Sequence, residues 1–165
     1  MQNSENLCNI RVIGGLMTFE AIILSAAKSA QVSGILLLAI CSHESNDFTM
    51  NYAAQDHGSP SYGICQIKKA TAIQNGFNEK NENLMNPKTN AKYAALYLKY
   101  QQARYGENNW CVLAASYNSG SYSPSRKVPG CPRNLKYIKL VQKKLPLQFR
   151  DKLQCEDREL ADENF

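Results

Sequence analysis

Glu44 has the residue type and the sequence position that acid–base chemistry requires. It comes soon after an apolar run, Gly34–Cys41, at the point where polar residues begin abruptly. A carboxyl group at the mouth of a buried apolar helix loses hydration, which raises its pKa and makes it a competent general acid near neutral pH. The local sequence also permits a plainer interpretation, in which Glu44 only marks the place where the helix meets water.

The elements that position Glu44 are predicted to be helices. Across Phe19–Ala30 the apolar residues follow the period of an amphipathic helix, with Thr18 as its N-cap. A second helix begins at Ser33–Gly34 and is apolar nearly all round through Cys41. We therefore expect this second helix to be buried at the centre of the fold, with Glu44 at its polar end.

The remaining segments are predicted to be helices and loops. Residues 46–63 are rich in Asn, Asp, Gly, Ser and Pro, which is the composition of a long functional loop. Further helices are expected at about 68–75, 86–106, 110–117 and 134–145, with a second loop at 118–134. Because no segment shows sustained alternation, the chain is predicted to be mainly α-helical, with about six to seven helices. Residues 1–15 are expected to be a lead-in and 151–165 a charged, peripheral tail.

Four short motifs follow one another along these elements. They are Glu44–Ser45, Gly63–Gln66, Asn86–Pro87 and Ser116–Gly120, within the runs LLLAICSHES, SYGICQIKKATA, NPKTNAKYAALYLKYQ and LAASYNSG. In this order and at these distances they closely resemble the SLT-type lytic transglycosylase family, and Asn134–Ile138 is similar to its closing segment. The resemblance covers residues 20–145. It implies a lysozyme-like fold and a single catalytic domain over residues 1–165.

The resemblance also implies an activity, the lytic cleavage of bacterial peptidoglycan. Glu44 would protonate the oxygen that bridges N-acetylmuramic acid and N-acetylglucosamine, while the substrate's own N-acetyl group stabilises the developing positive charge. Glu44 would then accept the proton of the C6 hydroxyl of the same muramyl sugar, which closes a 1,6-anhydro ring. This reaction consumes no water and requires neither a metal nor a cofactor.

A second carboxylate is not required by this resemblance, although two aspartates lie nearby in the sequence. Most glycosidases hold two carboxyl groups, about 5–5.5 Å apart in retaining and about 6.5–9.5 Å apart in inverting enzymes. Asp47 follows Glu44 closely but already lies in a stretch with the composition of a loop, and Asp56 is a loop-borne alternative. His43 is interpreted as a surface or capping histidine rather than a ligand.

Five residues are expected, from the resemblance, to bind the substrate around the catalytic acid. Ser45 can form a hydrogen bond near the scissile sugar and orient the site. Gln66 and Asn118 offer both donors and acceptors, which suit acetamido groups and hydroxyls. Tyr117 and Tyr137 each supply a ring face for a sugar and a hydroxyl that could hold the acid in place. For both tyrosines, core packing with a satisfied hydroxyl is the alternative.

Two other functions are compatible with the same motifs. One is a lysozyme-type muramidase, which hydrolyses the same bond with water. The other is a non-catalytic cell-wall-binding module of a phage particle or secretion apparatus, against which the intact Glu44 argues. Nucleic-acid binding through the lysines of residues 136–144 has little support, because aromatic and basic residues are not interleaved in a recognisable module.

The composition is that of one globular domain that dissolves in water. The chain has 165 residues, of which 44% are hydrophobic and 20% charged, and its net charge of +5 favours anionic partners. No stretch reaches the ~18 uninterrupted apolar residues of a membrane span, and residues 1–9 lack the positive charge of an export signal. We expect a monomer that acts in the cell envelope, delivered by a phage particle or a secretion apparatus.

The six cysteines do not form a metal-binding or redox motif. They occur at positions 8, 41, 65, 111, 131 and 155, without a CxxC pair. We expect mostly reduced thiols, and the even count leaves one or two disulfides open. Cys41 and Cys65 lie in apolar stretches and are interpreted as small buried hydrophobic residues.

Overall fold

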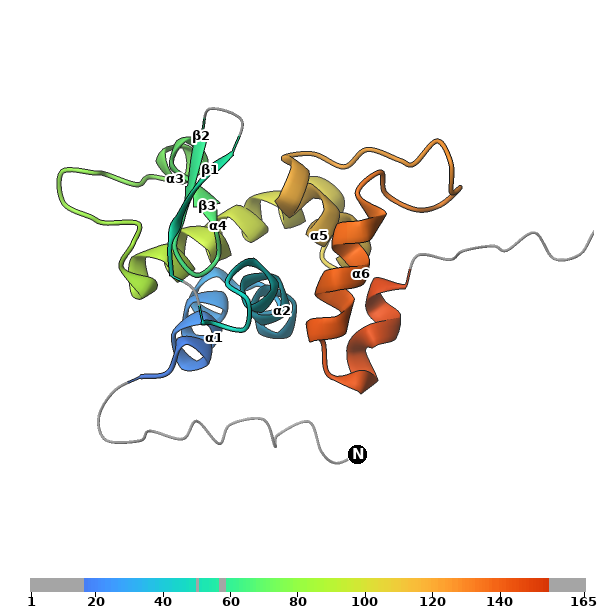
Figure 1. Ribbon diagram of the computed structural model, residues 1–165, viewed down its shortest axis with the longest axis horizontal. Helices are drawn as coiled ribbons and strands as arrows, with labels where there is room; N and C mark the ends of the chain where they lie inside the picture. Colours follow the sequence, from blue (N-terminus) through green and yellow to red (C-terminus); the bar gives the residue numbers. More distant parts are fainter. Residues whose placement is uncertain (1–16, 50, 57–58, 155–165) are drawn as a thin grey trace, which may run out of the picture.

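Helix α2 (Gly34–Glu44) is the central element of the fold (Figure 1). A computed structural model describes residues 17–49, 51–56 and 59–154. The Ser33 hydroxyl accepts a hydrogen bond from the backbone N–H of Leu36, which caps the start of the helix. The helix buries most of its apolar side chains, namely Leu36, Leu37, Ala39, Ile40 and Cys41. The prediction of a buried central helix that leads to Glu44 is confirmed.

Five further α-helices and one 3₁₀-helix occur in the described residues. Helix α1 (Phe19–Ala30) begins at its predicted cap, Thr18, and α4 (Pro87–Tyr105) begins at the predicted boundary near residue 86. Thr18 and Asn86 each accept hydrogen bonds from backbone N–H groups of the first turn. The others are α3 (Lys69–Gln74), α5 (Trp110–Ser119), α6 (Leu135–Lys144) and η1 (Leu147–Leu153). The predicted helical class and number of helices are confirmed.

The helices pack around α2 from several sides. Helix α1 contacts both α2 and α4, α6 packs directly against α2, and α5 contacts both α4 and α6. In Figure 1, α4 extends from the region of the sheet toward α5, while α6 and η1 form the right-hand part of the molecule. The C-terminal end of α2 therefore has α6 beside it, which brings together residues that are far apart in the sequence.

The segment that follows α2 contains a small antiparallel sheet instead of a continuous loop. Strand β1 (Ala53–Asp56) pairs with β2 (Ser59–Tyr62), and β2 pairs with β3 (Ile67–Lys68), in the order β1-β2-β3. The predicted loop over residues 46–63 is therefore wrong for residues 53–56 and 59–62, which form strands, while residues 46–49 and 51–52 have no regular secondary structure. Strands of four, four and two residues are too short to show alternation, and packing against α3 and α4 stabilises them where local propensity does not.

The end of the described chain also differs from the prediction. Residues 151–153 belong to η1, and the Leu153 side chain is only 1% exposed. The expectation that the chain is peripheral from residue 151 onward is therefore wrong for Leu153, which joins the core, whereas Asp151 and Lys152 are exposed. The predicted lead-in, residues 1–15, and residues 155–165 of the predicted tail lie outside the described residues. Among the helices that are described, none is long and apolar enough to cross a membrane.

Candidate active site

Glu44 is the last residue of α2, and its carboxyl group is bound by a side chain of α6. The Tyr137 hydroxyl donates a hydrogen bond to Glu44 Oε1 over 2.9 Å. Burial raises the pKa of Glu44 to about 7, and the hydrogen bond from Tyr137 opposes part of this rise because it favours the charged form. At neutral pH such a group exists in both protonation states, so it can both give and take a proton.

Tyr137 is held beside Glu44 by the packing of α6 on α2. It is buried together with Ile138 and Val141 of the same helix. The ring of His43 packs against the Tyr137 ring edge-on, with the centroids 5.2 Å apart. His43 lies in the last turn of α2 and is half-buried against this tyrosine, so it is only partly at the surface. Burial, together with the nearby Lys144, lowers the pKa of His43.

A groove of about 270 Å³ opens beside Glu44. Four of the six predicted site residues line it, namely Glu44, Gln66, Tyr117 and Asn118. The sheet, α3, α4 and the end of α5 supply the rest of the lining: Ala54, Ser61, Ile67, Lys68, Thr71, Tyr97, Ser119 and Gly120. The acid thus shares one concave surface with amide and hydroxyl groups, which is an arrangement suited to a ligand rich in hydroxyl and amide groups.

Gln66 is fixed by two hydrogen bonds from its own amide nitrogen. Nε2 donates to the backbone carbonyls of Tyr52, over 2.9 Å, and Gly63, over 2.8 Å. The Gln66 backbone has a φ of 47°, in the left-handed region that few non-glycine residues adopt. The turn between β2 and β3 therefore presents Gln66 to the groove in one defined conformation.

Asn90 is a site-supporting residue that the sequence analysis missed. This α4 side chain is fully buried, and its Oδ1 accepts a hydrogen bond from the backbone N–H of Cys65 over 2.8 Å. Its Nδ2 donates to the carbonyls of Tyr62 and Leu84. A Cβ atom on Gly63 would lie 2.3 Å from Asn90 Nδ2, so only glycine fits there. The sequence signal that could have identified Asn90 is its position beside the inward-facing alanines of this helix, where a polar side chain needs buried hydrogen-bond partners.

Tyr117 and Asn118 lie side by side at the end of α5 but have different partners. The Tyr117 hydroxyl donates to the backbone carbonyl of Cys65 over 3.1 Å, so it supports the sheet side of the site and does not hold Glu44. Asn118 is exposed, and its Oδ1 accepts a hydrogen bond from Asn134 Nδ2 over 2.9 Å. Of the two hydroxyls expected to hold the acid, the structure places only that of Tyr137 in contact with it.

The order of these elements and the position of the groove agree with a known family. The Transglycosylase SLT domain family matches residues 21–130, which is more than half of the chain. The chain belongs to this family. The matched range includes Glu44, Gln66 and Asn118 and ends before Tyr137. No curated protein sequence matches the chain.

Two solved structures resemble this SLT domain. The lytic transglycosylase Slt from Pseudomonas aeruginosa, solved as an inactive mutant, is 17% identical with a TM-score of 0.52, over 82% of this chain and 22% of that chain. The 70 kDa soluble lytic transglycosylase from Escherichia coli is 19% identical with a TM-score of 0.49, over 80% of this chain and 22% of that chain. The SLT domain thus spans about a fifth of these longer proteins. The first structure confirms the predicted lysozyme-like fold.

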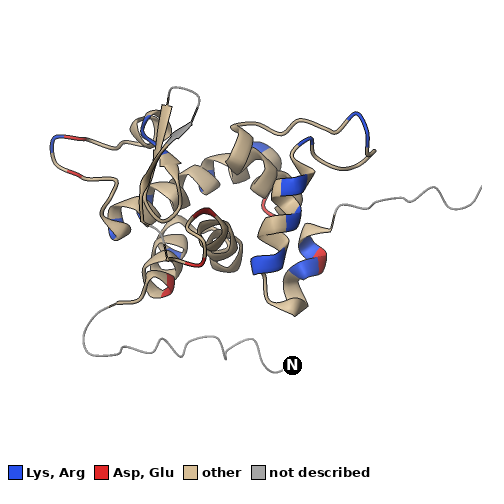
Figure 2. Cartoon of the chain, viewed as in Figure 1, with Lys and Arg blue, Asp and Glu red and all other residues tan. Residues whose placement is uncertain are grey.

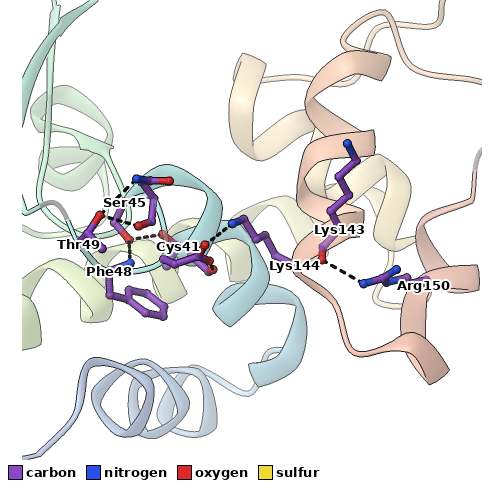
Figure 3. A network of polar contacts seen from close by, with 10 residues as sticks. Cys41, Ser45, Phe48, Thr49, Lys143, Lys144 and Arg150 are labelled. Atoms are coloured by element: carbon purple, nitrogen blue, oxygen red, sulfur yellow. Dashed lines mark hydrogen bonds and ion pairs between the residues drawn. The ribbon is translucent and has the colours of Figure 1, made fainter.

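Ser45 of the SLT domain is buried behind Glu44. Its side chain has no exposed surface, and its Oγ donates to the carbonyl of Cys41 over 2.7 Å and accepts from the N–H of Phe48 over 3.1 Å (Figure 3). Both bonds are internal to the end of α2 and the turn after it. The structure therefore places Ser45 in the wall that supports the acid and away from the groove lining.

A disulfide joins α2 to the turn that carries Gln66. Cys41 and Cys65 are bonded, with their Cα atoms 4.1 Å apart. The expectation that these two cysteines are reduced is wrong, although both are fully buried as predicted. Because Cys41 lies one turn before Glu44 and Cys65 directly before Gln66, the bond fixes the acid and the amide relative to one another.

The two candidate second carboxylates differ in what the structure shows. Asp47 accepts hydrogen bonds from Ser42 and Lys144 and does not line the groove. Asp56 is the last residue of β1 and pairs with Ser59 at the tip of the hairpin. Within the described part of the groove lining, Glu44 is the only carboxylic acid. In the same described residues, no group of three His, Cys, Asp or Glu side chains could hold a metal ion.

Proposed function

We propose that this SLT domain is a peptidoglycan lytic transglycosylase that leaves 1,6-anhydro-N-acetylmuramic acid ends. It would cleave the β-1,4 bond between N-acetylmuramic acid and N-acetylglucosamine. The observation that carries the proposal is a carboxyl group with a pKa of about 7 in the wall of a groove, hydrogen-bonded to Tyr137. Membership of the Transglycosylase SLT domain family supports the same class of reaction.

The reaction begins with Glu44 in its protonated form. Its proton passes to the bridging oxygen as the bond from that oxygen to C1 of the muramyl sugar breaks, and the N-acetyl group of the same sugar stabilises the positive charge on C1. The Glu44 carboxylate, to which Tyr137 donates, then accepts the proton of the C6 hydroxyl. The C6 oxygen bonds to C1, which closes the anhydro ring and returns the proton to Glu44.

The remaining predicted residues would bind and orient the glycan. Gln66 and Asn118 lie in the groove lining and present amide groups to hydroxyl and acetamido groups of the sugar. Tyr117 lines the groove, while its hydroxyl donates a hydrogen bond to the backbone carbonyl of Cys65. Ser45, which is buried, would act indirectly by holding the end of α2.

Transfer within the substrate is favoured over hydrolysis by the lack of a second groove carboxylate among the described side chains. Hydrolysis needs a base that activates water on the other face of the sugar, or a nucleophile that forms a covalent intermediate. Asp47 does neither, because it turns away from the groove toward Lys144. Attack by the C6 hydroxyl of the substrate requires no such residue. Glu44 is a carboxylate once it has protonated the leaving oxygen, and it can then accept the proton of the C6 hydroxyl.

Mass spectrometry of the fragments released from purified sacculi tests the proposal. Muramyl ends lighter by one water than reducing ends are expected from the wild-type chain and are expected to disappear with Glu44→Gln. Glu107→Gln, at an exposed glutamate, is the matched control and should behave as the wild type. Reducing ends would identify a lysozyme-type hydrolase, and intact sacculi with measurable binding would identify a wall-binding module.

The proposed substrate places the site of action in the cell envelope. Peptidoglycan lies outside the cytoplasmic membrane, so the chain must reach it to act, and we propose a phage particle or a secretion apparatus as the route. We also propose that the domain acts as a monomer and needs no cofactor, since the Glu44 mechanism draws all its reacting groups from one chain and the substrate.

A further inference from the structure

The turn that follows Glu44 has an unusual backbone. Asn46, Asp47 and Phe48 have φ angles of 49°, 56° and 62°, so three successive non-glycine residues lie in the left-handed region. This conformation is unfavourable for residues with a Cβ atom, most of all for a bulky one such as Phe48, and it persists only where the surroundings hold it in place. The chain thus makes a sharp, constrained turn immediately after its catalytic acid.

Hydrogen bonds from α2 hold this turn at several points. The backbone N–H of Asp47 donates to the carbonyl of Ser42 over 2.8 Å, and the Ser42 hydroxyl donates to Asp47 Oδ1 over 2.6 Å. The N–H of Phe48 donates to the buried Ser45 hydroxyl, and the Phe48 ring packs near that of Phe19, with centroids 6.1 Å apart. The turn therefore fixes the direction in which the Asp47 carboxylate points beside the end of α2.

The second oxygen of Asp47 reaches across to α6. Lys144 Nζ lies 2.6 Å from Asp47 Oδ2, and Figure 3 shows Lys144 extending from the end of α6 toward the turn. Figure 2 shows that lysines and arginines gather along α6 and η1, so α6 offers many cations, of which Lys144 makes this contact. One carboxylate thus bridges the last turn of α2 and the last turn of α6.

Lys144 lies on the same face of α6 as Tyr137. Seven residues separate them, which is about two turns of an α-helix, so their side chains leave the helix in nearly the same direction. Both meet the end of α2: Tyr137 meets Glu44 and Lys144 meets Asp47. The ion pair and the catalytic hydrogen bond are therefore two points of attachment between the same pair of helices.

We propose that Asp47 is a positioning residue, which through Lys144 holds α6 against α2 so that the Tyr137 hydroxyl stays on Glu44. This inference rests on the proposed function of Glu44. An exposed ion pair contributes little to global stability, and the side chains of Asp47 and Lys144 are 61% and 26% exposed. Its contribution is therefore expected in the geometry and charge state of the site, not in the melting temperature.

The titratable groups around the two carboxylates determine how loss of the ion pair would change the pKa of Glu44. Glu44 faces Tyr137 from α6 and Tyr117 from α5. Asp47, in the turn after α2, faces Lys144 from α6 and His43 from the last turn of α2. The hydrogen bond from Tyr137 stabilises the charged form of Glu44 and so lowers its pKa. Loss of the ion pair should weaken this hydrogen bond, and the pKa of Glu44 should then rise.

Kinetics of sacculus solubilisation across pH test this inference with Lys144→Met and Asp47→Asn. We expect kcat to fall roughly five- to ten-fold with KM changed less than about two-fold. The alkaline limb of the pH profile should move to higher pH, as is also expected for Tyr137→Phe, which removes the hydrogen bond to Glu44 itself. Lys144→Arg keeps the ion pair and should therefore retain the wild-type kcat and the wild-type alkaline limb. Lys143→Met, at the adjacent exposed lysine, should match the wild type.

The double variant Tyr137→Phe with Lys144→Met separates positioning from any other role of the pair. If Lys144 acts through Tyr137, its removal should change neither kcat nor the alkaline limb in the Tyr137→Phe background. Additive losses, or single variants with a wild-type pH profile, would overturn the inference while the proposed function stands. A wild-type chain that releases no anhydro ends would instead reject the proposed function.

Discussion

Tyr137 Oη lies 2.9 Å from Glu44 Oε1, although 93 residues separate the two in the sequence. This contact ties the charge state of the acid to the packing of α6 on α2. Burial raises the pKa of Glu44, and the Tyr137 hydrogen bond lowers it again in part, so that it comes to lie at about 7. The charge state of Glu44 therefore depends on a helix that contributes one side chain to the site.

Removal of the Tyr137 hydroxyl should change the pH dependence of the reaction. In Tyr137→Phe the ring and its burial remain, but the carboxylate loses its donor, so the pKa of Glu44 rises. We expect the alkaline limb of kcat/KM to move up by about one pH unit and kcat to fall about ten-fold, measured by clearance of a sacculus suspension. Tyr100→Phe, at a half-exposed tyrosine of α4, is the control. An unmoved limb would show that the hydrogen bond does not set the pKa.

The raised pKa of Glu44 should also appear in the stability of the protein. The ordinary pKa of 4.5 applies to the unfolded chain and a pKa of about 7 to the folded one, so between these values the folded state holds the proton more tightly. The free energy of unfolding therefore falls as pH rises through this window, by about 3 kcal/mol in total. Glu44→Gln has no titratable group at this position, so its free energy of unfolding should not show this decrease.

Urea unfolding of both proteins at acidic and alkaline pH measures this effect. Relative to the wild type, Glu44→Gln should gain about 3 kcal/mol between pH 4 and pH 8. The exposed Glu107→Gln should show no such pH-dependent gain. A constant difference between wild type and Glu44→Gln at all pH values would mean that burial does not perturb the acid.

Reduction of the Cys41–Cys65 disulfide should weaken both the fold and the site. The bond closes a loop with a sequence separation of 24, for which loop-closure entropy predicts a stabilisation of about 3 kcal/mol. We expect a reductant to lower the melting temperature and the activity together, because Glu44 and Gln66 lose their common anchor. The Cys41→Ala/Cys65→Ala double variant should be less active and insensitive to reductant. An equal response of that variant would implicate another thiol.

Asn90 should be more important for folding than its polar side chain suggests. Asn90→Ala leaves the Cys65 N–H and the Tyr62 and Leu84 carbonyls without their amide partner in a buried place. We expect a loss of about 2–4 kcal/mol in the free energy of unfolding, measured with urea. The exposed Asn81→Ala is the matched control. A loss below about 1 kcal/mol would mean that water replaces the amide.

The helical part of the fold could be predicted because its signals are local. Thr18, Ser33 and Asn86 each cap a helix, and the apolar run before Glu44 is long enough to identify the central helix. The sheet could not, since its short strands depend on contacts with distant elements, among them the Asn90 amide. Local pattern thus located the acid but not the surface that faces it.

The site shows the same division. Residue type and motif order identified the groove residues Gln66 and Asn118, but they could not say which tyrosine hydroxyl reaches Glu44, because that depends on how α6 packs. Nor could they show that Cys41 and Cys65 are bonded, since the two cysteines approach only when the turn after β2 packs against α2. Pairing between distant segments is a property of the folded chain.

Digestion of purified sacculi in water labelled with oxygen-18 tests the central claim most directly. If Glu44 promotes bonding of the C6 oxygen to C1 of the same muramyl sugar, the released muramyl ends must be anhydro forms that contain no labelled oxygen. Glu44→Gln should release none of them. Muramyl reducing ends that carry one labelled oxygen would show that water is the nucleophile and would contradict the account.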